Sequence, residues 1–186
     1  MGELNTQSTP LDGLYEIRNS WVGDARGRIS RLFCEQDFAA IRAGLHFTQI
    51  NLSETTQRGS IRGMHYQTPP AAEAKLIRCL RGSVFDVAVD LRADSATFLQ
   101  CHAIELSEDN DCAVFIPEGF AHGFQALTSA VQLLYLHTAA WTPAREAGVR
   151  HDDPRLAIDW PLPVGMISDK DRRYPLIDEH FRGAQP

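Results

Sequence analysis

Residues 75–91 read KLIRCLRGSVFDVAVDL, and this stretch decides the fold class. It contains two runs of strand-forming residues, 75–81 and 84–91, separated by the turn signal Arg81-Gly82. Apolar side chains alternate strictly in the second run, where Phe85, Val87, Val89 and Leu91 share one face. A period of two residues is typical of a β-strand whose two faces meet different surroundings. The stretch therefore predicts two consecutive strands.

Similar short runs occur along most of the chain. We predict strands at 47–53, 60–67, 75–81, 84–91, 102–106, 113–116 and 131–138. Many short strands separated by turn signals are typical of an antiparallel sandwich or barrel. One helix is expected at 35–43, capped by Asp37 and ended by Gly44, and short helices near 152–155 and 168–173. We predict one domain over residues 1–186, with 1–12 flexible and 141–186 packing on the barrel as loops and short helices.

Composition excludes several classes of protein. The 186 residues carry 18 basic and 24 acidic side chains, a net charge of −6, which disfavours nucleic-acid binding. No apolar stretch is long enough to span a membrane, and the hydrophobic fraction of 44% is that of a globular protein. The four cysteines show no CxxC spacing, which indicates a reduced, cytoplasmic location.

Two polar clusters interrupt the apolar pattern, each with one histidine. His65 lies in IRGMHYQ (61–67), and His122 lies in PEGFAHGF (117–124). Arg62 and His65 differ in parity, so a regular strand would point them to opposite faces. Gly63 between them is a natural site for a β-bulge, which would bring both side chains to one side.

The two histidines are open to three interpretations. Metal-binding β-barrels commonly use His-x-His with a carboxylate and a further His, but Gln67 stands where the second His would be. Glu73 is available as a carboxylate, yet two loose motifs make a weak metal site. As structural residues, His65 would be a satisfied core group and His122 would bond the backbone in a tight turn. As catalytic residues, they would move protons.

Residues elsewhere favour proton transfer. Asp171 is suited to orient a histidine through its ring N–H, Tyr135 is a buried phenol on a strand face with His137, and Lys75 begins a strand. Each also has a structural interpretation. Tyr135 would be a core residue, Lys75 a solvated strand end and Asp171 a surface charge.

These segments resemble the dTDP-4-dehydrorhamnose 3,5-epimerase family of nucleotide-sugar epimerases. The matching segments run in the family's order through nearly the whole chain: 23–27 (GDARG), 49–51 (QIN), 62–67 (RGMHYQ), 75–79 (KLIRC), 84–92 (VFDVAVDLR), 116–124 (IPEGFAHGF), 153–154 (DP), 159–161 (DWP) and Ser168-x-Lys170-Asp171. The resemblance implies an all-β fold, a double-stranded β-helix jelly roll or cupin-like barrel, and a homodimer. It also implies deoxysugar and polysaccharide biosynthesis, with neither a cofactor nor a metal.

The resemblance implies epimerisation at C3 and C5 of a nucleoside-diphosphate 4-keto-6-deoxy sugar, most simply dTDP-linked. His65 would be the base and Asp171 its partner, Lys75 would stabilise the enolate, and Tyr135 would return a proton from the opposite face. Such a reaction needs a base on one face, an acid on the other and a donor at the oxygen. The implied substrate-binding residues are Arg26, Gln49, Asn51, Arg62, His122, Trp141, Glu146 and Lys170.

Three positions depart from the family's pattern. Arg31 replaces a Glu where the base is recognised, Leu136 replaces a polar residue after the catalytic Tyr, and Ala140 replaces a Tyr. Because of these departures, the identity of the nucleotide stays open. The alternative that the enzyme inverts C3 alone stays open as well.

Two further classes share the resemblance. A sugar 3,4-ketoisomerase of the same fold tends to use paired histidines, which Gln67 argues against. A non-catalytic sugar-binding cupin would be expected to have lost His65, Tyr135 or Lys75, and all three are present.

Overall fold

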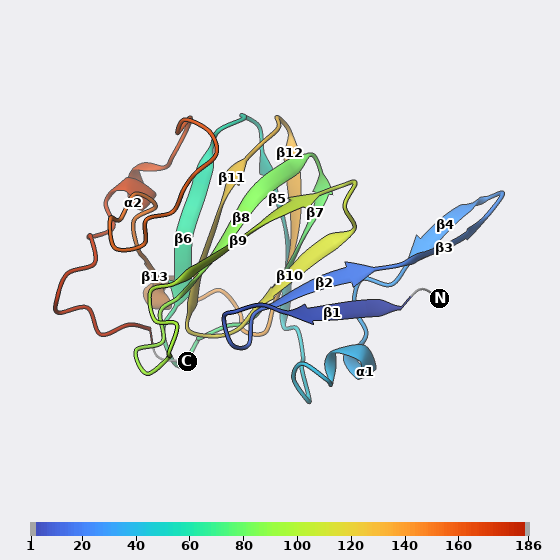
Figure 1. The fold of residues 1–186 in the computed structure, drawn as a ribbon, viewed down its shortest axis with the longest axis horizontal. Coiled ribbons are helices and arrows are strands. Elements are labelled where there is room, and N and C mark those ends of the chain that lie inside the picture. The colour runs from blue at the N-terminus through green and yellow to red at the C-terminus, as the bar shows by residue number, and fades with distance from the viewer. Residues whose placement is uncertain (1–2, 185–186) are drawn as a thin grey trace.

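Two antiparallel sheets face each other in this protein, whose computed structural model describes residues 3–184 (Figure 1). The six-stranded sheet has the order β1 (Leu4–Ser8), β2 (Tyr15–Asn19), β10 (Cys112–Ile116), β7 (Lys75–Arg81), β12 (Val131–His137) and β5 (Gln49–Thr55). The five-stranded sheet has the order β13 (Glu146–Gly148), β6 (Ile61–Gln67), β11 (Phe120–Ala126), β8 (Ser83–Asp90) and β9 (Cys101–Ser107). Because strands distant in sequence interleave in both sheets, the chain forms the expected jelly-roll, cupin-like barrel.

A two-stranded hairpin stands apart from the barrel. Its strands are β3 (Trp21–Asp24) and β4 (Gly27–Ser30), and Figure 1 shows it projecting beyond the end of β2. Several of its apolar side chains are exposed, among them Val22 at 49% and Ile29 at 59%. The hairpin thus presents apolar surface away from the core of its own chain.

Three apolar clusters hold the layers together. The first fills the space between the sheets and includes Ile77, Val84 and Phe124. The second lies on the outer face of the five-stranded sheet, where Val149, Leu156 and Ile177 pack on Val87 and Val89 among other residues. The third joins the six-stranded sheet to the short helix α1 (Glu35–Phe38) through Phe38 and Phe115, with Ile17 and Leu76 in the same cluster. Burial of these side chains supplies the main driving force for the fold.

The alternation in the sequence predicted most barrel strands correctly. Each of the seven expected strands is present, with ends that differ by at most two residues from those of β5 to β10 and β12. The strands β1 to β4, β11 (Phe120–Ala126) and β13 were not among the strands expected from the sequence. The first of these pairs with β2 along its whole length, so Leu4–Ser8 is a strand and not part of a flexible terminus. Residues 1–2 lie outside the described part of the chain.

Two of the three helix predictions need correction. The helix expected at 35–43 spans only Glu35–Phe38. Asp37, the expected cap, lies inside the helix and bonds Arg31 at 2.7 Å, and the residue at the N-cap, Cys34, makes no capping hydrogen bond. Residues 152–155 form a turn and no helix. There the Asp153 carboxylate accepts from the backbone N–H of Arg155, an alternative to helical hydrogen bonding.

The helix expected near 168–173 is confirmed. It is α2 (Asp169–Arg172), and the Ser168 hydroxyl accepts from the Asp171 backbone N–H at 3.0 Å. A 3-10 turn, η1 (Pro143–Arg145), precedes β13. None of the helices in residues 3–184 has the length and apolar character needed to cross a membrane.

The predicted bulge in β6 is also confirmed. His65 pairs with His122 on β11, whereas Arg62 pairs with Phe124, so three steps along β6 match two along β11. Gly63 has φ +127°, and a Cβ there would lie 2.5 Å from the Gly123 Cα atom. The bulge therefore requires glycine, and it lets both Arg62 and His65 line the same cavity.

Candidate active site

A cavity of about 710 Å³ opens between the two sheets. Its walls carry polar side chains from both sheets and from the segment around α2. Ten of the twelve residues predicted from the sequence line it: Asn51, Arg62, His65, Lys75, His122, Tyr135, Trp141, Glu146, Lys170 and Asp171. Residues as far apart as Asn51 and Asp171 thus meet in one concave site, the form expected of a small-molecule site.

His65 is held on the wall formed by the five-stranded sheet. Its Nε2 atom lies 2.8 Å from Asp171 Oδ1, and the other carboxylate oxygen accepts from the Gly63 backbone N–H at 3.3 Å. A carboxylate only accepts, so the neutral imidazole donates from Nε2 and keeps its lone pair on Nδ1. Burial raises the pKa of Asp171, but the hydrogen bond from His65 and the other donors outweigh it and hold the pKa below its ordinary value.

His122 lies directly opposite His65 on the neighbouring strand. Its Nε2 atom is 2.8 Å from Asp86 Oδ2, and both side chains are almost fully buried. Burial lowers the pKa of His122, and the Asp86 carboxylate opposes this only in part. The residue is therefore neutral near pH 7, and it bonds a carboxylate, not the backbone group expected for a structural histidine. The apolar alternation of 84–91, with Asp86 on a buried face, was the available signal for this partner.

Lys75 and Tyr135 come from the facing wall, the six-stranded sheet. The Lys75 ammonium lies 3.3 Å from Glu73 Oε1 and 3.3 Å from the His65 carbonyl oxygen. The Tyr135 ring packs edge-on against His122 and stacks on His137. Burial raises the pKa of Tyr135, so its hydroxyl stays protonated at neutral pH. The cavity consequently has a histidine–carboxylate pair on one wall and a phenol with an ammonium on the other.

The mouth of the cavity carries charged and aromatic groups. Lys170 Nζ is 2.6 Å from Glu146 Oε1, and Trp141 is 57% exposed. Arg62 is held by Thr55 Oγ1 at 2.9 Å and by the Glu54 carbonyl at 3.0 Å. This edge of the site offers positive charge beside a flat aromatic surface.

Two predicted binding residues do not line the cavity. Gln49 supports it from behind, because its side chain accepts from the Trp141 backbone N–H at 3.0 Å and donates to Asn51 at 3.1 Å. Arg26 lies at the tip of the β3–β4 hairpin, where its side chain is 90% exposed and pairs with Asp24. Within a single chain, Arg26 is therefore not part of the site.

Gln67 has a structural role. Its buried amide donates to the carbonyls of Ala71 and Ala140 and accepts from the Thr142 backbone N–H. Within residues 3–184, no group of three or more His, Cys, Asp or Glu side chains is arranged to hold a metal ion.

Sequence reasoning missed the role of His137 and weighed Glu73 only as a metal ligand. Both line the cavity, and Glu73 Oε2 is 2.9 Å from His137 Nδ1. The parity of β12 was the usable signal, because His137 lies two residues after Tyr135. Of the departures from the family's pattern that lie near Tyr135, neither Leu136 nor Ala140 lines the cavity, whereas His137 does.

The family model of dTDP-4-dehydrorhamnose 3,5-epimerase matches residues 8–179. The chain belongs to this family. Its known members include nucleotide-sugar epimerases, which are isomerases. A dTDP-4-dehydrorhamnose 3,5-epimerase of Sinorhizobium fredii is 37% identical over 96% of this chain and 92% of its own length. A dTDP-4-dehydrorhamnose 3-epimerase of Streptomyces niveus is 38% identical over 91% of this chain and 82% of its own.

A solved structure of the family supports the same fold. The dTDP-6-deoxy-D-glucose-3,5-epimerase of Legionella pneumophila, in complex with dTDP-4-keto-L-rhamnose, superimposes with a TM-score of 0.90 at 36% identity. The similarity covers 99% of this chain and 100% of the Legionella chain. The family relationship therefore extends over the whole domain.

Proposed function

We propose that this chain inverts C3 and C5 of dTDP-4-keto-6-deoxyglucose. The observation that carries the proposal is the arrangement of one cavity, with His65 and Asp171 on one wall and Tyr135 and Lys75 on the facing wall. Membership of the epimerase family, and the dTDP-4-keto-L-rhamnose bound to the Legionella enzyme, support the substrate class.

The chemistry starts at the C4 ketone, which acidifies the protons on C3 and C5. His65 takes the proton through its free ring nitrogen, while Asp171 holds the ring and stabilises the imidazolium. The electron pair moves onto the ketone oxygen, where the Lys75 ammonium stabilises the enolate. Such a donor contributes roughly 3 kcal/mol to transition-state stabilisation.

Inversion follows when the proton returns from the other side. Tyr135 comes from the opposite sheet and remains a neutral phenol at neutral pH, so it is an acid facing the base across the sugar. If His65 and Tyr135 were on the same wall, the proton would return to the face of the sugar that it had left. The separation of the two residues on two sheets favours inversion over simple exchange.

The nucleotide would lie at the mouth of the cavity. Trp141 offers an exposed indole for stacking on the base, and Arg62 and Lys170 offer positive charge to the diphosphate. Arg31 is engaged by Asp37 and does not line the cavity, so within one chain it does not contact a ligand there.

A homodimer would explain the predicted binding role of Arg26, which does not reach the cavity of its own chain. The outer face of β5 and β12 exposes Ile50 and Leu52, at 63% and 61%, each directly opposite a leucine on β12. Exposed apolar surface of this kind marks protein contacts. We propose that it packs against a second copy, and that the projecting hairpin delivers Arg26 to the partner's cavity.

Inversion of C3 alone is the second candidate. It is favoured by the similarity to the 3-epimerase of Streptomyces niveus and by His137, which packs on the proposed acid.

We also propose a cytoplasmic location. All four cysteines are free thiols, and burial raises the pKa of Cys79 and of Cys101 to about 11, which keeps both protonated and unreactive.

Isotope exchange tests the function. The protein is incubated with dTDP-4-keto-6-deoxyglucose in deuterated water, and the sugar protons are followed by NMR. Deuterium at C3 and C5 is the expected result, and deuterium at C3 alone selects the second candidate. Absence of exchange with dTDP-, UDP- and GDP-linked 4-keto sugars would overturn the enzymatic proposal.

A further inference from the structure

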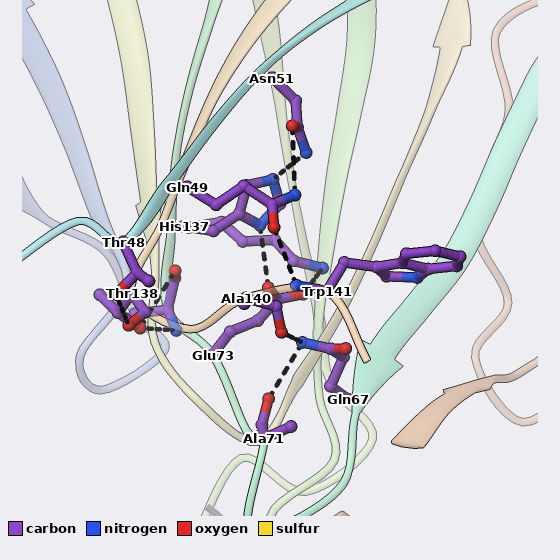
Figure 2. A network of polar contacts seen from close by, with 12 residues as sticks. Thr48, Gln49, Asn51, Gln67, Ala71, Glu73, His137, Thr138, Ala140 and Trp141 are labelled. Carbon is purple, nitrogen blue, oxygen red and sulfur yellow. Dashed lines mark hydrogen bonds and ion pairs between the residues drawn. The ribbon is translucent and has the colours of Figure 1, made fainter. Parts of the chain in front are cut away.

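A chain of polar contacts runs behind Lys75 and along the cavity wall. Figure 2 shows its middle part, from the Trp141 backbone through Gln49 and Asn51 to His137 and Glu73. His137 Nε2 is 3.3 Å from Asn51 Nδ2, and Nδ1 is 2.9 Å from Glu73 Oε2. Because the amide nitrogen only donates, the neutral imidazole accepts at Nε2 and donates from Nδ1 to Glu73.

Glu73 forms the junction between this chain and Lys75. One carboxylate oxygen accepts from His137, and the other lies 3.3 Å from the Lys75 ammonium. The three side chains are almost buried, at 7% exposure for Glu73, 9% for Lys75 and 12% for His137. Burial raises the pKa of Glu73, but the His137 hydrogen bond and the Lys75 charge outweigh it, so the pKa is lowered and the carboxylate is ionised.

A buried ammonium needs such a partner. An isolated cation loses much of its solvation free energy in a low-dielectric site and would shed its proton. The Lys75 ammonium has three N–H donors, and its contacts are the Glu73 carboxylate and the His65 carbonyl. One donor remains for a substrate oxygen in the cavity.

The same carboxylate also creates a difficulty. A negative charge beside a developing enolate opposes the stabilisation that Lys75 provides. If Lys75 were the only partner of Glu73, the carboxylate would rotate to accept from both Lys75 N–H groups that the His65 carbonyl leaves free. The hydrogen bond from His137 occupies one oxygen, withdraws part of the charge and fixes the orientation of the other oxygen.

We propose that Glu73 and His137 are positioning residues for Lys75: Glu73 anchors the ammonium, and His137 holds Glu73 so that one Lys75 donor stays free for the substrate oxygen. This inference rests on the proposed role of Lys75 at the C4 ketone. His137 also stacks on Tyr135, with the ring planes 12° apart, so the Glu73–His137 pair lies against the proposed acid as well.

Other titratable groups line the same cavity as Lys75, on both of its walls. They are His65 on β6, His122 on β11, and Tyr135 and His137 on β12. Removal of Glu73 changes the only carboxylate that contacts the ammonium among the described residues. Because Glu73 also bonds His137, the effect of its removal on the pH profile is compared with the effects of the His137 variants.

The experiment compares five variants in the deuterium-exchange reaction, with kcat and KM measured across a wide pH range. One of them, Lys75→Ala, tests the role of the ammonium itself and should lose exchange. Glu73→Gln should lower kcat about tenfold with little change in KM, and should move the alkaline limb down by about one to three pH units. His137→Leu should lower kcat about tenfold, because Glu73 loses its donor. His137→Asn keeps an N–H donor of similar reach and should restore most of that loss.

His102→Leu is the matched control. His102 also pairs with a glutamate, Glu16, at 3.0 Å, but the pair lies outside the cavity. This variant should leave kcat and the pH profile unchanged. Thermal unfolding of every variant separates a folding defect from a loss of positioning, and the pair His137→Leu and His137→Asn stays informative if Glu73→Gln unfolds.

Two results would overturn the inference while leaving the function intact. In the first, Lys75→Ala loses exchange but Glu73→Gln and His137→Leu keep the wild-type kcat and pH profile. In the second, His137→Leu and His137→Asn lose kcat equally. Failure of the wild type to exchange deuterium would instead count against the proposed function itself.

Discussion

His65 is held through one ring nitrogen, and this decides how it acts. The Asp171 carboxylate accepts a hydrogen bond from the Nε2–H group, so the basic nitrogen is Nδ1. The two residues are 106 positions apart, and no spacing rule connects them. Their types and motifs were recognisable in the sequence, but only the resemblance joined them, because the contact depends on how α2 returns to β6. The contact between Glu73 and His137 could not be predicted for the same reason.

Asp171→Asn tests the pair at the residue scale. An amide holds the ring in the wrong tautomer and does not stabilise the imidazolium, so kcat for exchange should fall about 10²-fold to 10⁴-fold. Asp152→Asn, which alters an exposed carboxylate paired with Arg150, should have no effect. Equal activities of the two variants would show that His65 does not need its carboxylate.

The pH dependence of Asp171 has a definite sign. Its folded-state pKa lies below the ordinary value of 3.8, so its contribution to stability is complete above that pH and disappears as pH falls through the lower folded value. Loss of activity at mildly acidic pH would therefore come from other groups than Asp171.

Strand β6 is the element on which the site depends. Its bulge places Arg62 and His65 on one side, and parity together with Gly63 was enough to predict it. Alternation also predicted the central strands, since each buries one apolar face. It failed for β3 and β4, whose residues are mostly exposed, for β13, which has three residues, and for β11, whose seven residues are all buried. Strands that are short, exposed or buried on both faces leave no alternating signal.

Gly63→Ala tests the bulge. A Cβ at φ +127° would lie 2.5 Å from the Gly123 backbone, so unfolding in urea should show a loss of about 1–3 kcal/mol or more. Gly44→Ala is the control, because Gly44 also has positive φ, at +69°, but open space around it. It should lose about 1 kcal/mol. Equal losses would mean that crowding at Gly63 is unimportant.

The whole molecule leaves one face of the barrel uncovered. The C-terminal segment covers the five-stranded sheet and α1 covers part of the other, but β5 keeps the exposed side chains of Ile50 and Leu52. The β3–β4 hairpin, which carries Arg26 in its turn, projects beyond the barrel (Figure 1). The sequence contains no periodic signal for a contact between chains, so the homodimer could be expected only from the resemblance to the family.

A mixed dimer tests the proposed exchange of Arg26. Arg26→Ala and His65→Ala chains, carrying different tags, are co-expressed and the heterodimer is purified. One of its two cavities would have both residues intact, so it should have about half the wild-type activity, whereas each homodimer is impaired. A heterodimer no more active than the two homodimers would show that Arg26 does not serve a partner's cavity.

The central claim is that a base and an acid act from opposite walls of one cavity, and Tyr135→Phe in deuterated water tests it most directly. NMR follows both deuterium incorporation and configuration at C3 and C5. The variant should still exchange deuterium, because His65 is intact, but should lose inversion; His65→Ala should lose both. Normal inversion by Tyr135→Phe would contradict the assignment of the acid and the two-wall mechanism with it.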